Sequence, residues 1–297
     1  MTEAALQQPV LRSRWDVLRD YLSLFKLRIV VLLVGTAVGP MFPAARGLPS
    51  GSLVLAVIVG GALAASGAHA INCWLDRDID AVMRRTRRRP IPAGRIPAWH
   101  ALVLGILLNV AAFVVLATLT NLVAALLALA GTIIYVFVYT LWLKRWTSQN
   151  IVIGGSAGAV PPLVGWAAVT GSVDMTALSL FLVILCWTPP HFWALAQMIR
   201  RDYERADIPM MPVVAGQRST KSQSLAYAVV TMAVSMVPFF THATGAVYLV
   251  GAALLGLGLV TLAALDLTAS GWTRRLYRYS SLYLAALFVL LAVGALA

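Results

Sequence analysis

Nine long apolar segments run through most of the chain, and they constrain its fold more than any other feature. They cover roughly residues 27–45, 52–74, 99–119, 121–143, 150–170, 177–199, 225–243, 245–265 and 279–297. Each has about the 20 residues that an α-helix needs to cross a bilayer. Charged residues make up only 11% of the chain, whereas soluble domains carry about 25%. The sequence therefore predicts an all-α membrane protein with nine transmembrane helices.

Two pairs of neighbouring segments are joined by very short connections, at residues 118–122 and 241–246. One continuous helix is the alternative in each case. Such a helix would be about twice as long as a bilayer is thick. We therefore expect a tight hairpin at both connections.

The basic residues predict how these helices are oriented. With the N-terminus in the cytoplasm, 22 of the 23 lysines and arginines fall on the cytoplasmic side, and only Arg46 lies outside. This distribution follows the positive-inside rule. It accounts for the net charge of +12 through orientation and attraction to anionic lipid, so we expect no nucleic-acid partner.

The domain organisation that follows is simple: residues 1–26 form a cytoplasmic N-terminal segment, and residues 27–297 form one transmembrane domain. Within the segment, Trp15, Leu18, Leu22 and Phe25 share one helical stripe. This pattern favours a helix lying on the membrane surface, and a plain linker is the alternative.

Charge is concentrated in "NCWLDRDIDAVMRRTRRRP", residues 72–90, at the cytoplasmic end of the second span. Asn72, Asp76 and Asp80 are four residues apart and share one helix face. Oxygen ligands on one face suit Mg²⁺, which often bridges to phosphates. Asp78 points away from that face, beside Arg77, and we expect a local ion pair there. A solvated helix end is the alternative reading of the whole cluster.

A second acidic stretch, "RRDYERADIPMM", follows the sixth span and contains Asp202, Glu204 and Asp207. A metal held between two acidic patches, with arginines around it, is the arrangement that binds a diphosphate. Among the arginines we select Arg88 and Arg89, which precede the turn at residues 90–94. At the start of the fifth span, Asn150 lies near Lys144 and Arg145, where it caps the helix or contacts the diphosphate.

At these residues the chain resembles the UbiA superfamily of intramembrane prenyltransferases. The resemblance rests on residues 72–96, on "YTLWLKRWTSQNIVIGGSAGAVPP" from residue 139, on "WTPPHFWALA" from residue 187 and on "DYERADIPMMPVV" from residue 202. The "TPPHFWAL" and "IPMMPVV" stretches are typical of the branch of the family that modifies heme. Asp207 stands where that branch usually has a small or neutral residue, so its role is left open.

The resemblance implies a nine-helix bundle with a central cavity open to the cytoplasmic side, in the bacterial inner membrane. It implies farnesyl diphosphate as donor, heme b as acceptor, heme O as product and a heme A synthase as a downstream partner. The implied Mg²⁺ ligands are Asn72, Asp76, Asp80 and Asp202. Lys26 and Arg28 match a basic pair of the family at the start of the first span. Together with the residues inferred above, the predicted substrate contacts are Lys26, Arg28, Asn72, Arg88, Arg89, Lys144, Arg145, Asn150 and Tyr203.

The sixth span contains the histidine that we expect to meet the acceptor. Pro189 and Pro190 interrupt the backbone hydrogen bonds of this span, and His191 follows directly. His191 is predicted to ligate iron, bind a propionate or position water. A packing histidine that bonds a neighbouring helix is an equally favoured alternative, and the same choice applies to His69.

Two other functions compete with heme farnesylation. A relative that prenylates an aromatic ring, such as a quinone precursor, would carry the same carboxylate motifs, but "TPPHFWAL" argues against it. A transporter of an anionic metabolite would use a similar basic cavity. It would also need polar groups across the whole bilayer, whereas the outer halves of these spans are almost purely apolar.

Overall fold

The computed structural model describes residues 13–296, which are helical apart from turns and short connections. Nine spans in this part of the chain are long and apolar enough to cross a membrane. In chain order they are α2 with α3 (Leu27–Val38, Met41–Ala45), α4 (Gly51–Leu75), α6 (Ala98–Leu119), α7 with η1 and α8 (Leu122–Ile133, Ile134–Leu143, Lys144–Trp146), α9 with α10 (Asn150–Gly154, Ser156–Thr170), α11 (Met175–Met198), α14 with α15 (Gly216–Ser235, Val237–Phe240), α16 (Ala246–Thr268) and α17 (Thr273–Gly294). The predicted multi-pass helical membrane protein is confirmed, and both short connections are hairpins.

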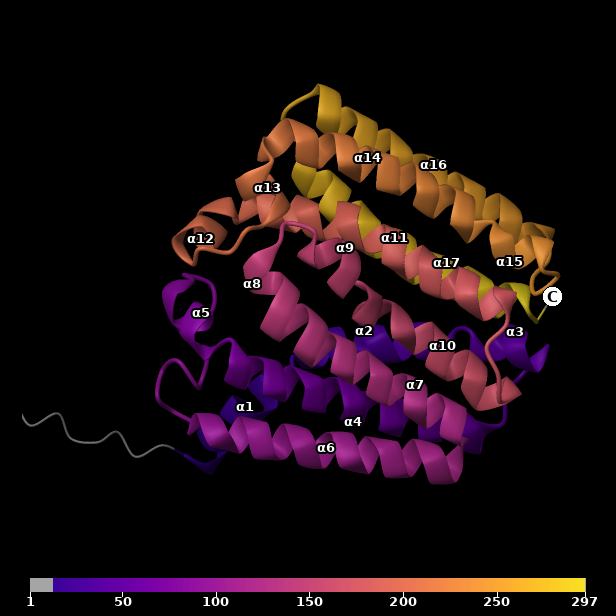
Figure 1. Ribbon diagram of the computed structural model, residues 1–297. Coiled ribbons are helices and arrows are strands. Elements are labelled where there is room, and N and C mark those ends of the chain that lie inside the picture. Colours follow the sequence, from indigo (N-terminus) through magenta and orange to yellow (C-terminus); the bar gives the residue numbers. More distant parts are fainter. Residues whose placement is uncertain (1–12, 297) are drawn as a thin grey trace, which may run out of the picture.

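In the described part of the chain, four shorter helices lie outside the spans: α1 (Arg14–Leu24), α5 (Arg77–Val82), α12 (Arg200–Arg205) and α13 (Met211–Val214). Figure 1 shows α5, α12 and α13 at one end of the bundle, together with α8, while α3 and α15 lie at the other end. We call the end that carries α5, α12 and α13 the basic end. Both charged motifs of the sequence are therefore at the same end of the molecule.

Two helices begin earlier than their apolar segments suggested, namely α14 at Gly216 and α17 at Thr273. The first turns of α14 are polar, and their hydroxyl groups bond within the helix: the Thr220 hydroxyl donates to the carbonyl of Gly216 at 2.7 Å. Hydropathy marks only the part of a helix that lies in lipid. Much of the stretch at residues 200–224, between the predicted sixth and seventh spans, is consequently helical.

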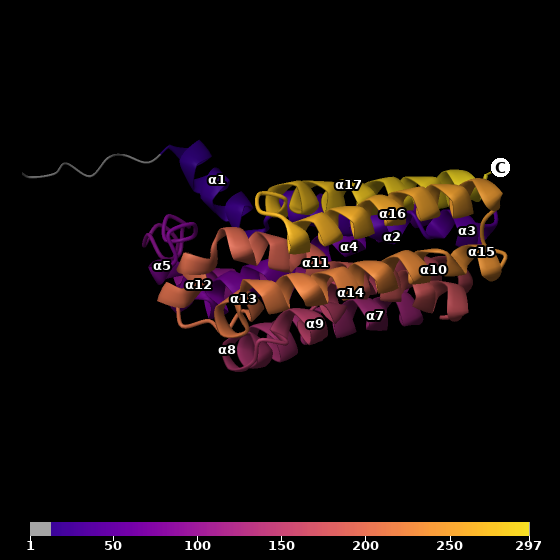
Figure 2. The same ribbon diagram turned by 90° about the horizontal axis from the view of Figure 1, so that it is seen from above.

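The core of the bundle is organised around the fifth span, α9 with α10, of which 67% is buried. One apolar cluster joins α10 to α2, α4, α6 and α7, and a second joins it to α11, α14, α16 and α17. Gly165 of α10 lies directly against the backbone of Ala37 in α2. The stacked helices of both groups can be followed in Figure 2.

Small residues allow these close contacts, although not every glycine of the fifth span takes part in one. Gly154 lies against the ring of Tyr139, and Gly155 lies against Thr188 of α11. Gly158 has open space beside it, so it makes no such close contact. The closest backbone contacts are instead at Gly165 and between Gly67 and Gly105 of α4 and α6.

The tandem prolines of the sixth span leave α11 continuous from Met175 to Met198. Because Pro189 and Pro190 have no N–H group, the carbonyls of Leu185 and Cys186 lose their helical donors. The Thr188 hydroxyl donates to the carbonyl of Ile184 at 2.7 Å. The prolines therefore leave a gap in the hydrogen-bond ladder without ending the helix.

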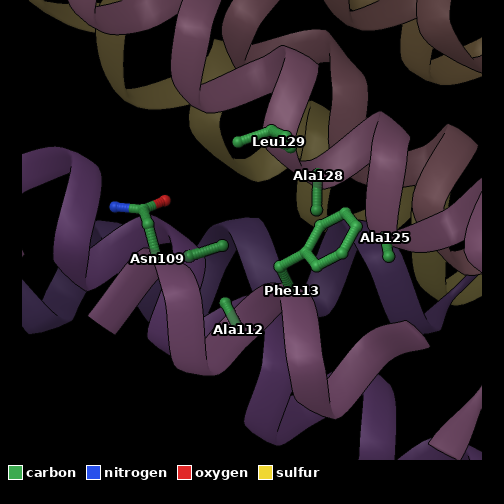
Figure 3. Close-up of a pocket in the computed structure, with 7 residues that line it drawn as sticks. Asn109, Ala112, Phe113, Ala125, Ala128 and Leu129 are labelled. Atoms are coloured by element: carbon green, nitrogen blue, oxygen red, sulfur yellow. The ribbon is translucent and has the colours of Figure 1, made fainter. Parts of the chain in front are cut away.

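A small cavity lies between α4, α6 and α7, lined by Ala64, Asn109, Ala112, Phe113, Ala125, Ala128 and Leu129 (Figure 3). Its volume is about 10 Å³, which is room for one water at most. The amide of Asn109 bonds the Gly105 carbonyl and the Thr132 hydroxyl. With its polar residue already satisfied, this cavity is a packing defect, and the expected central cavity stays a prediction.

Helix α1 packs beside the basic end. Tyr21 bonds His100 at 2.6 Å, and Asp20 pairs with Arg95 at 3.0 Å. The predicted stripe remains exposed at Trp15, where 78% of the residue is accessible, and at Leu18 and Leu22. An exposed apolar face on an anchored helix supports the proposal that α1 lies on the membrane surface. Residues 1–12 of the predicted N-terminal segment lie outside the described residues.

Candidate active site

A buried polar cluster lies where α4 ends and α5 begins. Asn72, Asp76 and Asp80 are 3%, 2% and 3% exposed. The Asp76 backbone N–H donates to the Asn72 carbonyl, and that of Asp80 donates to the Asp76 carbonyl, so the winding continues through the junction. The predicted spacing therefore places all three side chains in one buried site.

Three basic residues from distant parts of the chain surround this cluster. Lys26 Nζ donates to Asn72 Oδ1 at 2.7 Å, and Lys144 Nζ pairs with Asp76 Oδ2 at 2.6 Å. Arg89 Nη1 pairs with Asp80 Oδ2 at 2.7 Å. Three cations against two carboxylates leave an excess positive charge at the end of an apolar bundle, which favours an anion.

Lys26 reaches Asn72 because the backbone turns sharply between α1 and α2. Its φ and ψ are 52° and 50°, a left-handed conformation that is uncommon for residues other than glycine. Burial lowers the pKa of Lys26. A strained backbone and a desolvated ammonium group in one residue are typical of functional sites.

Helix η1 is a π-helix of ten residues, Ile134–Leu143. Such a long π segment is rare, and π turns occur frequently at functional sites. The Thr140 hydroxyl donates to the Tyr135 carbonyl at 2.8 Å and accepts from Asn72 Nδ2 at 3.1 Å. The Lys144 N–H donates to the Tyr139 carbonyl, five residues back. This winding brings Thr140 and Lys144 to the same cluster.

The second acidic motif is attached to the first by an apolar cap. The cap contains Ile79, Met83, Ile151, Trp193, Ala196, Tyr203, Ile208, Met210 and Met211. It joins α5, α9, α11, α12 and α13. Tyr203 is 3% exposed, and burial raises its pKa to about 12. Asp202, beside Tyr203, has a side chain that is 13% exposed and lies 3.9 Å from Arg205.

Within residues 13–296, no three His, Cys, Asp or Glu side chains lie close enough together to hold a metal ion. Asp76 and Asp80 are held by basic residues, and Asp202 lies near Arg205. One oxygen, Asp76 Oδ1, is buried and has no hydrogen-bond partner. An unpaired buried carboxylate oxygen is costly, so this atom is suited to accept a cation or a hydrogen-bond donor.

The expected ion pair between Arg77 and Asp78 is wrong. Asp78 instead accepts two hydrogen bonds from Arg145, at 2.8 and 2.9 Å, while Arg77 donates to the Trp74 carbonyl. The hydrogen bonds from Arg145 lower the pKa of Asp78 to about 2. Arg145 thus lies on the outer side of the cluster, because η1 and α8 place it over the exposed face of α5.

The other predicted contact residues are more dispersed. Arg28 and Arg88 are exposed, and the Arg88 carbonyl accepts from Arg95. Asn150 is fully buried; its Nδ2 donates to the Thr147 carbonyl at 2.6 Å, and its Oδ1 has no partner. Asp207 is exposed and has φ 51°, a conformation that Asp tolerates well. That backbone role accounts for Asp207 without a part in metal binding.

His191 lies between α11 and α17. Its Nδ1 bonds Ser280 Oγ at 2.8 Å, and its ring stacks with Trp187 and with Tyr277 at centroid distances of 4.3 and 4.9 Å. His69 of α4 is different: both ring nitrogens are buried without a partner, and the ring contacts Tyr135 edge to face.

Sequence reasoning missed Thr140, Tyr277 and Ser280 as neighbours of the predicted site residues. Thr140 is a polar residue in an apolar span, which is a weak signal in hindsight. Ser280 and Tyr277 had no signal, because Ser280 lies 89 residues from His191 and both contacts depend on how α11 and α17 pack.

Comparison with known proteins gives a consistent result. The model of the UbiA prenyltransferase family matches residues 32–282. A protein of Roseiflexus sp. (strain RS-1) called protoheme IX farnesyltransferase is 53% identical over 99% of this chain and 54% of its own length. A protein of the same name from Gloeobacter violaceus is 51% identical over 94% of this chain and 92% of its own length. The chain thus spans about half of the first relative and nearly all of the second.

Solved structures share the fold at low sequence identity. One, described as giving insights into a digeranylgeranylglyceryl phosphate synthase in membranes, has a TM-score of 0.78 and 18% identity, covering 95% of this chain and 99% of that one. A UbiA homolog from Archaeoglobus fulgidus bound to DMAPP and Mg²⁺ has a TM-score of 0.66 and 17% identity, covering 92% and 99%.

Proposed function

The chain belongs to the UbiA prenyltransferase family, and we propose that it transfers a farnesyl group from farnesyl diphosphate to a vinyl group of heme b. Water adds in the same reaction, and the product is heme O. The observation that carries this proposal is the buried cluster of Asp76 and Asp80 with Lys26, Lys144 and Arg89. The names of relatives that are about 50% identical, such as that from Gloeobacter violaceus, support heme as the acceptor.

The donor atoms of these residues suit a Mg²⁺ ion, although Asp76 and Asp80 are paired with Lys144 and Arg89 here. Mg²⁺ prefers oxygen ligands, and these are offered by Asn72, Asp76, Asp80 and Asp202. One of them, Asp76 Oδ1, is buried and has no hydrogen-bond partner. We propose that these four side chains hold the metal. When bound, Mg²⁺ supplies Lewis-acid stabilisation of the negative charge on the leaving diphosphate.

The protein's own cations act on the same charge. Lys26, Lys144 and Arg89 are positioned before the reaction, so they stabilise the leaving oxygens without reorganising. Arg28, Arg88, Arg145, Asn150 and Tyr203 remain proposed contacts of the diphosphate. Asn72 keeps Lys26 and Asp76 in place through direct hydrogen bonds, and its amide also donates to the Thr140 hydroxyl.

The bond changes then balance without a protein nucleophile. The bond between farnesyl C1 and the diphosphate oxygen breaks, and the vinyl group of heme forms a new carbon–carbon bond to C1. The resulting carbocation takes up water and releases a proton. The apolar spans hold the farnesyl chain and exclude other water from the allyl cation.

A direct assay tests this function. Purified protein is incubated with heme b, farnesyl diphosphate and Mg²⁺, and the porphyrins are analysed by mass spectrometry. The expected product is heme carrying one farnesyl group and one water, and its formation should stop when Mg²⁺ is chelated. Prenylation of an aromatic acceptor while heme b stays unchanged would replace heme as the proposed acceptor.

We also propose that the basic end faces the cytoplasm, because nearly all lysines and arginines lie on that side of the predicted topology. In a Cys73→Ser/Cys186→Ser background, Ser172→Cys should react with an impermeant thiol reagent added to intact cells. Arg87→Cys should react only after the membrane is permeabilised. Both positions are exposed, so accessibility of the side chain does not limit either reaction. Labelling of Arg87→Cys in intact cells would reverse the orientation.

A further inference from the structure

The contact between His191 and Ser280 fixes which nitrogen of the imidazole carries the proton. Ser280 is fully buried, and its hydroxyl donates to the Tyr277 carbonyl at 2.8 Å. A hydroxyl has one hydrogen. If that hydrogen were directed at His191 instead, the lone pairs of Ser280 Oγ and the Tyr277 carbonyl would face each other at 2.8 Å. Ser280 therefore accepts from His191, and Nδ1 carries the proton.

Neighbouring aromatic side chains also fix the orientation of the His191 imidazole. Trp187 stacks on it with an interplanar angle of 18°, and Tyr277 stacks with an angle of 26°. Trp187 Nε1 also donates to the Ser280 carbonyl at 2.8 Å. Two aromatic rings and one hydrogen bond thus determine the plane of the imidazole, and Nε2 is left with a lone pair in that plane.

This tautomer narrows what neutral His191 can bind. Nε2 without a hydrogen cannot donate to a propionate, so it acts as a metal ligand or as an acceptor from water. Histidines that ligate metals usually donate their other N–H to a neighbouring oxygen, which orients the ring and raises its basicity. The bond from Nδ1 to Ser280 is such an arrangement.

We propose that His191 Nε2 ligates the iron of the heme substrate, and that Ser280 is the positioning residue that selects this tautomer. The proposal rests on heme b being the acceptor. It assigns a part in substrate binding to α17, which carries none of the residues predicted from the charged motifs. It also implies that the two substrates are recognised separately, by His191 for heme and by the Asp76 cluster for the diphosphate.

The test compares Ser280→Ala with Ser281→Ala. Ser281 is the adjacent residue, is exposed and bonds the same Tyr277 carbonyl at 3.3 Å, so it is a matched control for helix stability. Purified variants are titrated with heme b, and the Soret band, the heme affinity and the melting temperature are recorded. Affinity for farnesyl diphosphate with Mg²⁺ is measured in parallel.

We expect Ser280→Ala to shift the Soret band and weaken heme binding by about 10- to 100-fold, the usual effect of losing such a partner. Ser280→Thr should restore both, and Ser281→Ala should match the wild type. Binding of farnesyl diphosphate should not change in any of them. A Ser280→Ala protein that is folded and keeps the wild-type spectrum and heme affinity would refute the positioning role.

Two further outcomes are distinguishable. If Ser280→Ala and His191→Ala slow turnover per folded molecule but leave the heme spectrum unchanged, Nε2 binds water and the iron-ligand proposal is wrong. If the wild-type protein binds no heme while it still binds farnesyl diphosphate, heme b is not the acceptor. The iron-ligand role of His191 is then wrong because the substrate is wrong, and not because of the tautomer.

Discussion

Asp76→Asn should lower turnover by on the order of a hundredfold or more, as expected when a charged ligand that acts in the transition state is lost. The substitution keeps the size of the side chain but removes the charge that faces Lys144 at 2.6 Å. It also replaces one of the two carboxylate oxygens with an N–H donor, which cannot coordinate Mg²⁺. Turnover and the Mg²⁺ dependence of farnesyl diphosphate binding should fall together.

Asp78→Asn is the matched control for this substitution. It removes the same charge two residues away, from a side chain that is 60% exposed and paired with Arg145. Its effect on turnover should be small. Asp80→Ala and Asp202→Ala should each reduce turnover as Asp76→Asn does. Equal activities of the Asp76 and Asp78 variants would contradict the assignment of the metal site to the buried face.

Gly165→Ala should destabilise the bundle strongly. A Cβ atom at residue 165 would overlap the backbone carbonyl of Ala37. Because no side chain can rotate away, α10 and α2 would have to separate. Overpacking typically costs about 1–3 kcal/mol, occasionally more, and we expect this case at the upper end. The melting temperature in detergent and the yield of monodisperse protein measure the effect.

Gly158→Ala provides the control within the same helix. A Cβ atom at residue 158 meets nothing within 4 Å, and alanine has the higher helix propensity. The melting temperature of Gly158→Ala should equal or exceed that of the wild type. Similar melting temperatures for the two alanine variants would mean that α10 and α2 do not approach as closely as described.

Much of the fold could be predicted because the bilayer makes hydropathy decisive. The nine spans, both hairpins and the common position of the two charged motifs all follow from apolar length and loop charge. Polar helix ends such as Gly216–Ser224 could not be predicted from hydropathy, because they lie outside lipid and contain few apolar residues. The tandem prolines interrupt backbone hydrogen bonds as predicted, and α11 still stays continuous, because neighbouring helices can stabilise a membrane helix whose backbone bonds are incomplete.

The site could be predicted as a set of residues but not as a set of contacts. The spacing of Asn72, Asp76 and Asp80 determines a shared helix face, so local sequence is sufficient for them. The partner of each carboxylate depends on packing between distant helices. Lys144 and Arg145 are adjacent in sequence, yet one binds Asp76 inside the cluster and the other binds Asp78 outside it.

Helix η1 also makes the site sensitive to chain length. Residues five apart differ by about 140° around an α-helix. The π winding instead brings them close enough to share a backbone hydrogen bond, as with Tyr139 and Lys144. Deleting one residue between Ile134 and Leu143 would let the segment return to α-helical winding and keep its apolar composition. It would also rotate Lys144 away from Asp76. In this span the number of residues matters as much as their identity, so relatives with a one-residue gap here would be expected to bind the diphosphate with a different basic residue.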